Sequence, residues 1–463
     1  MKNYKLYLVA LGFGGLFFVS STFATNPIIM DQFNADPTAR VFEGRIYLYP
    51  SHDIPVPPGS GVRQAWFCME DYHVFSSENL TDWTDHGIIC NQTNVPWLNR
   101  KGYDMWAPDC VFKNGTYYFY FPVGGRIGVA TSDKPYGPWK VLDKPVDGAS
   151  GIDPCVLQDD DGSSYLFTGA GGIAVAKLKD NMVELDTPPG DTNAVPTNNV
   201  PPGRGFRNSR MQRIANLPSP GLIEGPFAFK RNGIYYLTYP HAAHVTERLE
   251  YSTSTNVMGP YKWAGVITDE NESGCWTEHH SIVQYKGQWY LFYHDKQLSP
   301  NFDKNRSVRV DYLHFNDDGT IQKVIPTLRG VGNVDAKSKI QIDRYSAASK
   351  EGVSYSFLDA SNTFAGWKLS FTGTNGWSEF DRVDFGKGGL KSVNARAVST
   401  TGGVIEIHLD KADGPLLAKV EIGIGPDWGI VKSTLANVPS GLHDLFFTQP
   451  GSSNIDVDWV SFE

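Results

Sequence analysis

One unit recurs five times along the chain and constrains its fold more than any other feature. Each copy starts at an anchor residue, passes a tight turn ending in Gly, and continues into a strand rich in Tyr, Phe or Trp. In the copy GLIEGPFAFKRNGIYYLTYP at 221–240, Asn-Gly joins two alternating apolar runs, which is the strongest short-range signal for a β-hairpin. The anchors of the five copies are Asp36, Asp109, Asp153, Glu224 and His279.

The segments between the copies contain further short strands and Gly-Pro turns, so each repeat holds about four strands, the content of one propeller blade. Long helical periodicity is absent, and aromatic residues reach 13%, which favours an all-β chain. We therefore expect a five-bladed β-propeller over residues 25–330. Equivalent residues of the innermost strands converge on the propeller axis, so the five anchors should share one cavity.

Burying several carboxylates on one axis costs free energy, so such a cluster is expected mainly where the carboxylates have a function. Inverting glycoside hydrolysis is such a function, because it needs an ionised carboxylate to activate water and a protonated acid on the other side of the bond. A third carboxylate can raise the pKa of the acid. The residues alone do not order these three roles.

The motifs resemble glycoside hydrolase family 43, the five-bladed propeller enzymes that act on xylan and arabinan side chains. The matching stretches are NADPTARVFEGRIYLY at 34–49, GIDPCVLQDDDGSSYLF at 151–167, IEGPFAFKRNGIYYLTY at 223–239 and EHHSIVQYKGQWYLFYH at 278–294. The resemblance implies that Asp36 is the general base, Glu224 the general acid, and Asp153 the residue that orients the acid and raises its pKa. It also implies inversion of the anomeric configuration.

Other positions follow from the same resemblance. His279 matches a histidine that helps hold a central cation or water cluster, with His280 as the alternative. Arg306 matches an arginine that reaches the substrate, with Arg309 as its rival. Trp106 matches an aromatic platform under the sugar. Asp109 has no catalytic role in the family, and we interpret it as structural.

The tail is predicted to be a second domain. Composition shifts at 331–339, which we interpret as a linker, and the short strands of 340–463 predict a β-sandwich (jelly-roll). This part resembles carbohydrate-binding module family 6. The resemblance implies sugar-binding aromatics at Phe380 and Trp428, a polar contact at Asp456, and structural calcium ligands at Gln341, Asp343 and Asp458. The family usually has Tyr and Asn where Phe380 and Asp456 stand, which changes the hydrogen bonds available to a sugar.

Residues 1–24 are predicted to be a signal peptide, with Lys2 and Lys5 before an apolar run and Ala24 at the cleavage position. We expect an exported protein, periplasmic or secreted, with no membrane span once the signal is removed. The net charge of −9 argues against nucleic acid as a partner. Five cysteines leave at least one thiol free: either Cys68 pairs with Cys90, or all five are unpaired.

Together these features predict an exo-acting glycosidase that removes α-L-arabinofuranose or β-D-xylose from hemicellulose such as arabinoxylan or xylan. Its chemistry requires no cofactor, and calcium is expected only as a structural ion. The alternatives are an arabinan- or galactan-directed glycosidase of the same fold, a retaining relative acting on fructose polymers, and a non-catalytic carbohydrate-binding propeller.

Overall fold

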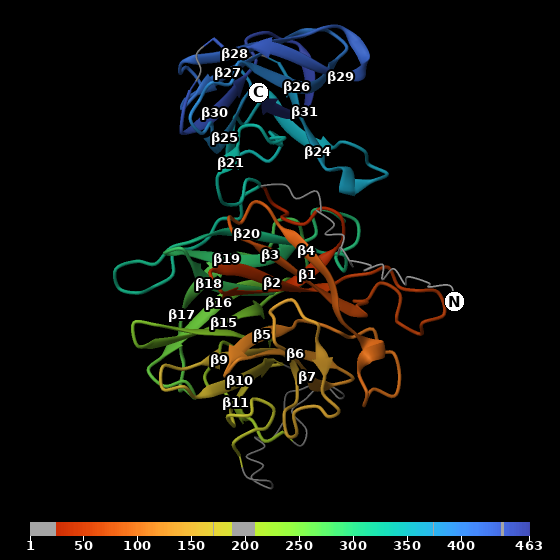
Figure 1. The fold of residues 1–463 in the computed structure, drawn as a ribbon, viewed down its shortest axis with the longest axis vertical. Helices are drawn as coiled ribbons and strands as arrows, with labels where there is room; N and C mark the ends of the chain where they lie inside the picture. The colour runs from red at the N-terminus through yellow and green to blue at the C-terminus, as the bar shows by residue number, and fades with distance from the viewer. Residues whose placement is uncertain (1–24, 170, 188–208, 374, 437–438) are drawn as a thin grey trace, which may run out of the picture.

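A computed structural model of the chain describes residues 25–169, 171–187, 209–373, 375–436 and 439–463. These residues form strands and two short 3-10 helices, Gln92–Asn94 and Thr363–Ala365. The predicted signal peptide and most of the long insert after Asp186 lie outside the described residues. Among the helices in the described ranges, none has the length and apolar character needed to cross a membrane. Figure 1 shows two β bodies, a larger one formed by the first part of the chain and a smaller one stacked on it.

Five antiparallel sheets make up the larger body, which confirms the predicted five-bladed propeller. In chain order their strands are β1 (Asn34–Phe42), β2 (Arg45–His52), β3 (Asp71–Ser77) and β4 (Thr84–Asn91); β5 (Asp109–Lys113), β6 (Thr116–Val123), β7 (Arg126–Ser132) and β8 (Lys140–Val141); β9 (Ile152–Gln158), β10 (Ser164–Gly169), β11 (Ile173–Leu178) and β12 (Gln212–Arg213); β13 (Leu222–Ile223), β14 (Phe227–Arg231), β15 (Ile234–Ala242), β16 (Arg248–Ser254) and β17 (Lys262–Thr268); and β18 (His280–Tyr285), β19 (Gln288–Asp295) and β20 (Ser307–Leu313).

The repeated turn is what builds each blade. Four of the hairpins between first and second strands are closed by two residues that both have positive φ, such as Asn232 at 50° and Gly233 at 78°. That conformation matches the right-handed twist of the flanking strands, and Asn-Gly adopts it with little strain. The aromatic run that follows each turn then pairs back along the first strand.

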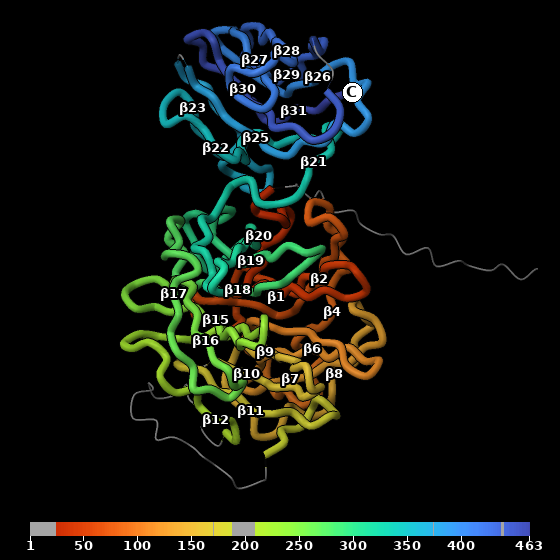
Figure 2. The backbone as a smooth tube through the Cα atoms, turned by 90° about the vertical axis from the view of Figure 1, so that its left-hand side faces the viewer, coloured from red at the N-terminus to blue at the C-terminus, as the bar shows by residue number. Residues whose placement is uncertain are grey.

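The first strands surround the propeller axis. Contacts link β1 to β5, β5 to β9, β9 to β14, β14 to β18 and β18 back to β1, which is a closed ring. The N-terminal segment completes the fifth blade, because Ile28 N–H donates to the Val308 carbonyl (3.0 Å) and Val310 N–H donates to Asn26 Oδ1 (2.9 Å). Figure 2 shows this red segment lying beside β20.

The smaller body is the predicted β-sandwich. One sheet contains β21 (Val334–Asp335), β22 (Ala347–Ala348), β25 (Trp377–Asp384), β27 (Gly403–Leu409), β28 (Leu416–Ile422) and β30 (Leu442–Thr448). The other contains β23 (Val353–Phe357), β24 (Trp367–Thr372), β26 (Ser392–Ser399), β29 (Gly425–Thr434) and β31 (Asn454–Phe462). Since β21 pairs with β25, the sandwich begins inside the segment 331–339 that was predicted to be a linker.

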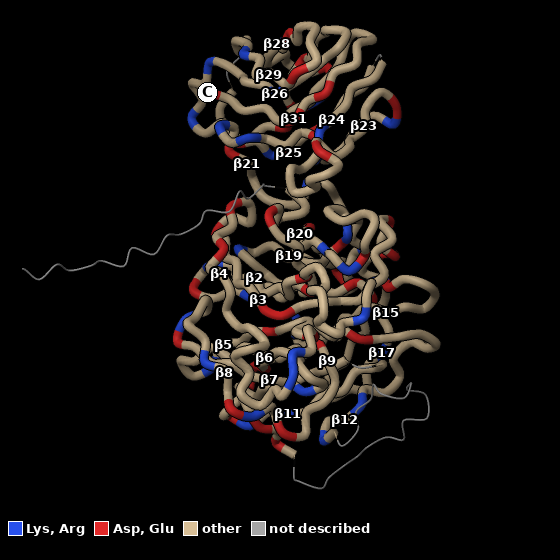
Figure 3. The backbone as a smooth tube through the Cα atoms, turned by 90° about the vertical axis from the view of Figure 1, so that its right-hand side faces the viewer, with Lys and Arg blue, Asp and Glu red and all other residues tan. Residues whose placement is uncertain are grey.

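The two bodies are joined by packed side chains. The Arg329 guanidinium lies 4.5 Å from the centre of the Phe380 ring, and Met30 and Leu298 of the propeller pack with Trp367 of the sandwich. Acidic and basic residues are interspersed over both bodies (Figure 3), a distribution unlike the basic surfaces that bind nucleic acid. The five cysteines are all buried and unpaired. The predicted Cys68–Cys90 disulfide was therefore wrong, and the alternative prediction of five free thiols is confirmed.

Candidate active site

Three backbone bulges at the starts of blades place the three acids. In β1 the pair Asp36-Pro37 lies opposite the single residue Pro50 of β2, and in β9 the pair Asp153-Pro154 lies opposite Thr168. Between β13 and β14 three residues, Glu224 to Pro226, lie opposite two of β15. A bulge re-aims a side chain out of the regular alternation. Asp36 (φ 51°) and Asp153 (φ 53°) adopt left-handed backbone conformations, which cluster at functional sites.

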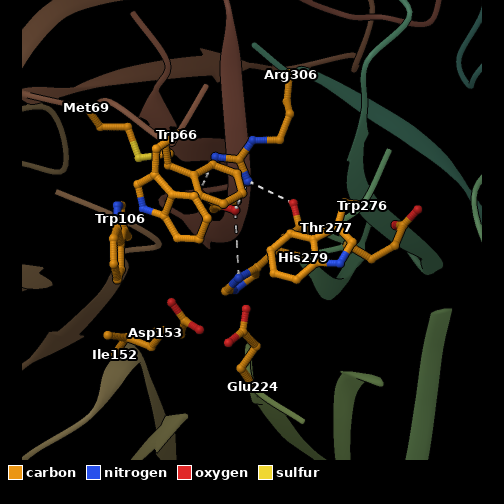
Figure 4. A pocket seen from close by; sticks show the side chains of 13 residues that line it. Trp66, Met69, Trp106, Ile152, Asp153, Glu224, Trp276, Thr277, His279 and Arg306 are labelled. Atoms are coloured by element: carbon orange, nitrogen blue, oxygen red, sulfur yellow. Dashed lines mark hydrogen bonds and ion pairs between the residues drawn. The ribbon is translucent and has the colours of Figure 1, made fainter. Parts of the chain in front are cut away.

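The bulges bring the acids to one pocket, shown in Figure 4. It lies among the first strands and is lined by Asp36, Trp66, Phe67, Met69, Trp106, Ile152, Asp153, Glu224, Trp276, Thr277, Glu278, His279 and Arg306. All six positions predicted for the propeller site are therefore lining residues. Asp109, the one anchor of the five that does not line the pocket, is buried and accepts from Arg40 (Nη2 to Oδ2, 2.6 Å) and from Val156 N–H (2.6 Å). These bonds link three blades and give Asp109 a structural role.

Asp36 is held as a carboxylate. The Arg306 Nη1 lies 2.8 Å from Asp36 Oδ1, and Ser51 Oγ donates to Asp36 Oδ2 at 2.5 Å. Burial by itself raises the pKa of a carboxyl, but the Arg306 charge and the remaining polar contacts outweigh it and lower the pKa of Asp36 to about 2. Asp36 is thus ionised at neutral pH and can accept a proton from water.

Two buried groups fix the position of that carboxylate. Asp53 accepts two bonds from the Arg306 side chain, from Nε and Nη2, both at 2.9 Å, which orients the guanidinium toward Asp36. His294 Nδ1 accepts the Asp36 backbone N–H at 3.0 Å, while its Nε2 lies 3.0 Å from the Thr277 carbonyl oxygen. Those contacts require Nε2 to carry the proton. Burial lowers the pKa of His294 to about 3, so the ring remains neutral.

Asp153 and Glu224 form the opposite arrangement, a carboxyl pair that retains a proton. Asp153 Oδ2 accepts the Gly225 N–H at 3.0 Å, so it is tied to the backbone next to Glu224. Burial, then the Glu224 carboxyl, raise the pKa of Asp153 well above its ordinary value. The backbone approaches closely here: a Cβ on Gly169 would lie 2.9 Å from Glu224 Cα. One pocket therefore contains an ionised carboxylate and a carboxyl pair that holds a proton.

We expect Asp153→Asn to move the alkaline limb of the kcat/KM pH profile toward acid by about one pH unit, because a neutral amide no longer helps to retain the proton of the pair. Asn tolerates the left-handed backbone of this position, so the bulge should persist. Rates on nitrophenyl pentosides across the pH range measure the shift. The acid limb, which reports Asp36, is the internal control, and an unchanged alkaline limb would contradict the pairing.

The remaining predicted residues fall into two groups. Arg306 contacts the pocket, whereas its rival Arg309 ion-pairs with Asp295 outside it. His279 lies in the pocket with Nδ1 3.9 Å from Asp36 Oδ1, whereas His280 Nε2 contacts Thr238 Oγ1 at 2.6 Å and does not line the pocket.

The prediction missed much of the pocket wall. Trp66, Phe67 and Trp276 come from loops, where no strand register marks a position, and the Trp276–Glu278 wall precedes β18. Burial raises the pKa of Glu278 to about 8, which adds another neutral carboxyl at neutral pH. Among the functional residues that the sequence analysis missed, His294 could have been found, because it directly follows the aromatic run of the fifth repeat.

The aromatic site predicted for the sandwich is not formed. Phe380 is only 1% exposed, because the alternation of β25 turns it into the core beneath Arg329, so its role as a sugar platform was wrong. Trp428 lies on the other sheet, with the Arg396 guanidinium 4.9 Å from its ring centre. Asp456 accepts from Lys368 Nζ (2.5 Å) and Ser370 Oγ (2.6 Å). The three residues thus do not form one binding surface.

The donors available to metals differ between sites. Asp343 Oδ1 is buried with no hydrogen-bond partner among the described residues and lines a small cavity with Gln341, so this oxygen could accept a cation. Asp343 Oδ2 is paired with Arg344 (2.8 Å), as Asp458 is paired with Arg396. Within the same ranges one further group could hold a metal, His52, Asp71 and His73 in the first blade, outside the pocket.

The fold and the pocket together define a class of protein. The pocket of this β-propeller holds an ionised carboxylate and a proton-bearing carboxyl pair between aromatic walls, and these are the groups that a glycosidase needs. The chain belongs to glycosyl hydrolases family 43, whose family model matches residues 24–321. A second family model, carbohydrate binding module (family 6), matches residues 345–463. Both predicted family resemblances are confirmed, and the protein is a glycoside hydrolase.

Known relatives fall into two sets. Xylosidase/arabinosidase 43A of Humicola insolens is 34% identical over 64% of this chain and 98% of its own. Arabinoxylan arabinofuranohydrolase of Bacillus subtilis (strain 168) is 29% identical over 95% of this chain and 92% of its own, so it spans both bodies. Among solved structures, a β-xylosidase/α-arabinofuranosidase from a compost microbial metagenome, in complex with xylotriose, is 32% identical with a TM-score of 0.55, covering 65% of this chain and 97% of that one.

Proposed function

We propose that this protein is an inverting, exo-acting hydrolase that removes α-L-arabinofuranose or β-D-xylose units from arabinoxylan or xylan-type hemicellulose. The observation that carries the proposal is the opposed ionisation of Asp36 and the Asp153–Glu224 pair in one buried pocket. Relatives named for xylosidase and arabinofuranosidase activities support the choice of pentoses.

In the proposed reaction, Glu224 donates its proton to the glycosidic oxygen as the bond from that oxygen to the anomeric carbon breaks. Asp36 takes a proton from a water molecule, whose oxygen bonds to the anomeric carbon from the opposite face. Asp153 keeps the proton on Glu224 before the reaction, and Arg306 keeps Asp36 ionised. Side chains supply the whole proton transfer, so this scheme requires no cofactor.

The blocked propeller axis supports exo action. Arg40 contacts Asp109, Val156 and Phe227, one residue from each of three other blades, so its guanidinium occupies the axis and we expect only a terminal or side-chain sugar to enter the pocket. Trp106 is proposed as the platform under that sugar, and His279, whose pKa burial lowers to about 4, as a neutral ring that contacts the sugar or holds a central cation.

Three expectations from the sequence complete the proposal. Residues 1–24 direct export to the periplasm or the exterior, where hemicellulose is available. Gln341 and Asp343, with Asp458, would hold a structural calcium. The partner is an uncharged polysaccharide or its oligosaccharides.

The test is to incubate the purified protein with arabinoxylan, xylo-oligosaccharides, arabinan and galactan, and to identify the released sugars. We expect free arabinose or xylose, with the inverted anomer appearing first in an NMR time course. A retained anomer appearing first would contradict inversion, and release of galactose alone would contradict the pentose assignment.

A further inference from the structure

A second, larger cavity lies where the two bodies meet. Its volume is about 640 Å³, and its walls come from blade loops of the propeller and from β23, β24 and the preceding segment of the sandwich. The exposed aromatic residue of its wall is Tyr355 in β23, at 38% of its surface, with Tyr345 edge-on to it at 6.2 Å between ring centres. Phe357 adds a third ring. This cavity is called the junction groove below.

The propeller side of the junction groove is polar. Ser273 Oγ and Arg309 Nε are buried with no hydrogen-bond partner among the residues that the structure describes. Asp269, Glu270 and Glu272 supply acceptor oxygens at the same wall. Flat aromatic rings facing hydrogen-bonding side chains suit a sugar, whose ring faces are apolar and whose hydroxyls donate and accept. The carboxylates disfavour an anionic ligand.

The junction groove is a fixed feature, because hydrogen bonds to Gln297 join the two bodies in its wall. Arg344 of the sandwich donates from Nη1 to Gln297 Oε1 of the propeller at 3.1 Å, and its guanidinium lies 3.8 Å from the centre of the Trp367 ring. Gln297 Nε2 reaches the hydroxyl of Tyr355 at 3.5 Å. The groove is therefore largely formed before any ligand binds, which lowers the entropic cost of binding.

The same two loops line both the junction groove and the active-site pocket. The loop after β17 contributes residues 269–273 to the groove and 276–279 to the pocket. The end of β19 and the loop after it contribute residues 295–297 to the groove, and this loop leads to Arg306 in the pocket. Ser273 and Trp276 are three residues apart, so their Cα atoms lie within about 11 Å.

We propose that the junction groove binds a stretch of the uncharged polysaccharide main chain while the active-site pocket holds the pentose to be removed. The inference rests on the proposed function for the identity of the polymer. It gives the sandwich a binding role through its β23 edge rather than through Phe380 and Trp428. Tyr355 is the platform residue, and the loop carboxylates accept sugar hydroxyls.

The test compares Tyr355→Ala with Tyr136→Ala, a matched control whose tyrosine is 40% exposed but lies on the second blade, outside both cavities. We expect Tyr355→Ala to lower the ratio of kcat/KM on neutral arabinoxylan to kcat/KM on nitrophenyl pentosides about fivefold, equivalent to about 1 kcal/mol. The control should keep the wild-type ratio. An unchanged ratio in Tyr355→Ala, or an equal fall in the control, would overturn the proposal.

A binding measurement separates this proposal from the proposed function. In native gels containing arabinoxylan, the inactive Asp36→Asn protein should be retarded, and adding Tyr355→Ala should reduce the retardation. Equal retardation of both proteins, or no retardation of either, would overturn the proposal that the junction groove binds the polysaccharide. If the wild type hydrolyses no pentoside but retardation still depends on Tyr355, the proposed function fails and the groove stands.

Discussion

Glu224→Gln should lower kcat/KM on xylobiose or arabinoxylan by about three orders of magnitude, because the amide has no proton to give to the departing oxygen. The same variant should lose far less on a dinitrophenyl pentoside, whose leaving group departs without protonation. Gln preserves the shape of the side chain, and Gly225 N–H remains available to Asp153, so the fold of the pocket should not change. Paired kinetics on the two classes of substrate measure the difference.

Glu278→Gln is the matched control for that experiment. Glu278 is also a buried pocket carboxyl that is neutral at neutral pH, since burial raises its pKa to about 8. We expect its substitution to cost less than tenfold on both substrates, because its role is not proton donation. If Glu278→Gln instead reproduced the dependence on leaving group and Glu224→Gln did not, the general acid would be Glu278.

The fold was predictable because the repeat acts locally. Each Gly-containing turn and the aromatic strand after it specify a hairpin on their own, and five hairpins in register can bury their faces only by closing a ring. The bulges were not predictable in this way. The sequence marks Asp36 and Asp153 by the prolines that follow them, but the left-handed backbone and the re-aimed side chains appear only when the first and second strands are paired.

The site was predictable where it lies on strands and not where it lies on loops. Asp36, Asp153 and Glu224 occupy equivalent positions in the repeated unit, so recognising one of them predicts the positions of the other two. Trp66 and Trp276 have no register to share, and their place in the wall depends on loop conformations set by the whole propeller. Phe380 was misassigned for a related reason: a family position does not reveal that Arg329, from the end of the propeller, would cover the ring.

Asp36→Asn should lower kcat/KM by about 10⁴-fold on every substrate, because activation of water is needed whatever the leaving group. This uniform loss distinguishes the base from Glu224. Azide, which attacks without giving up a proton, should restore turnover and yield a glycosyl azide of inverted configuration. Recovery of wild-type kinetics without azide, or a loss confined to poor leaving groups, would contradict the assignment.

The same substitution should also destabilise the protein, with a sign opposite to that of Asp153→Asn. Folding lowers the pKa of Asp36 from 3.8 to about 2, so its charge contributes about 2 kcal/mol above pH 3.8, and this contribution is lost as pH falls toward 2. Asp36→Asn removes this contribution and leaves Arg306 with Asp53 as its remaining carboxylate partner.

Asp153→Asn should have the opposite effect. Folding raises the pKa of Asp153, so its charge costs stability as pH rises, and Asp153→Asn should raise Tm at neutral pH. Thermal unfolding at neutral pH and near pH 3 checks both signs: the deficit of Asp36→Asn should shrink in acid, and a deficit that stays constant would show that Asp36 stabilises the fold by packing rather than by charge.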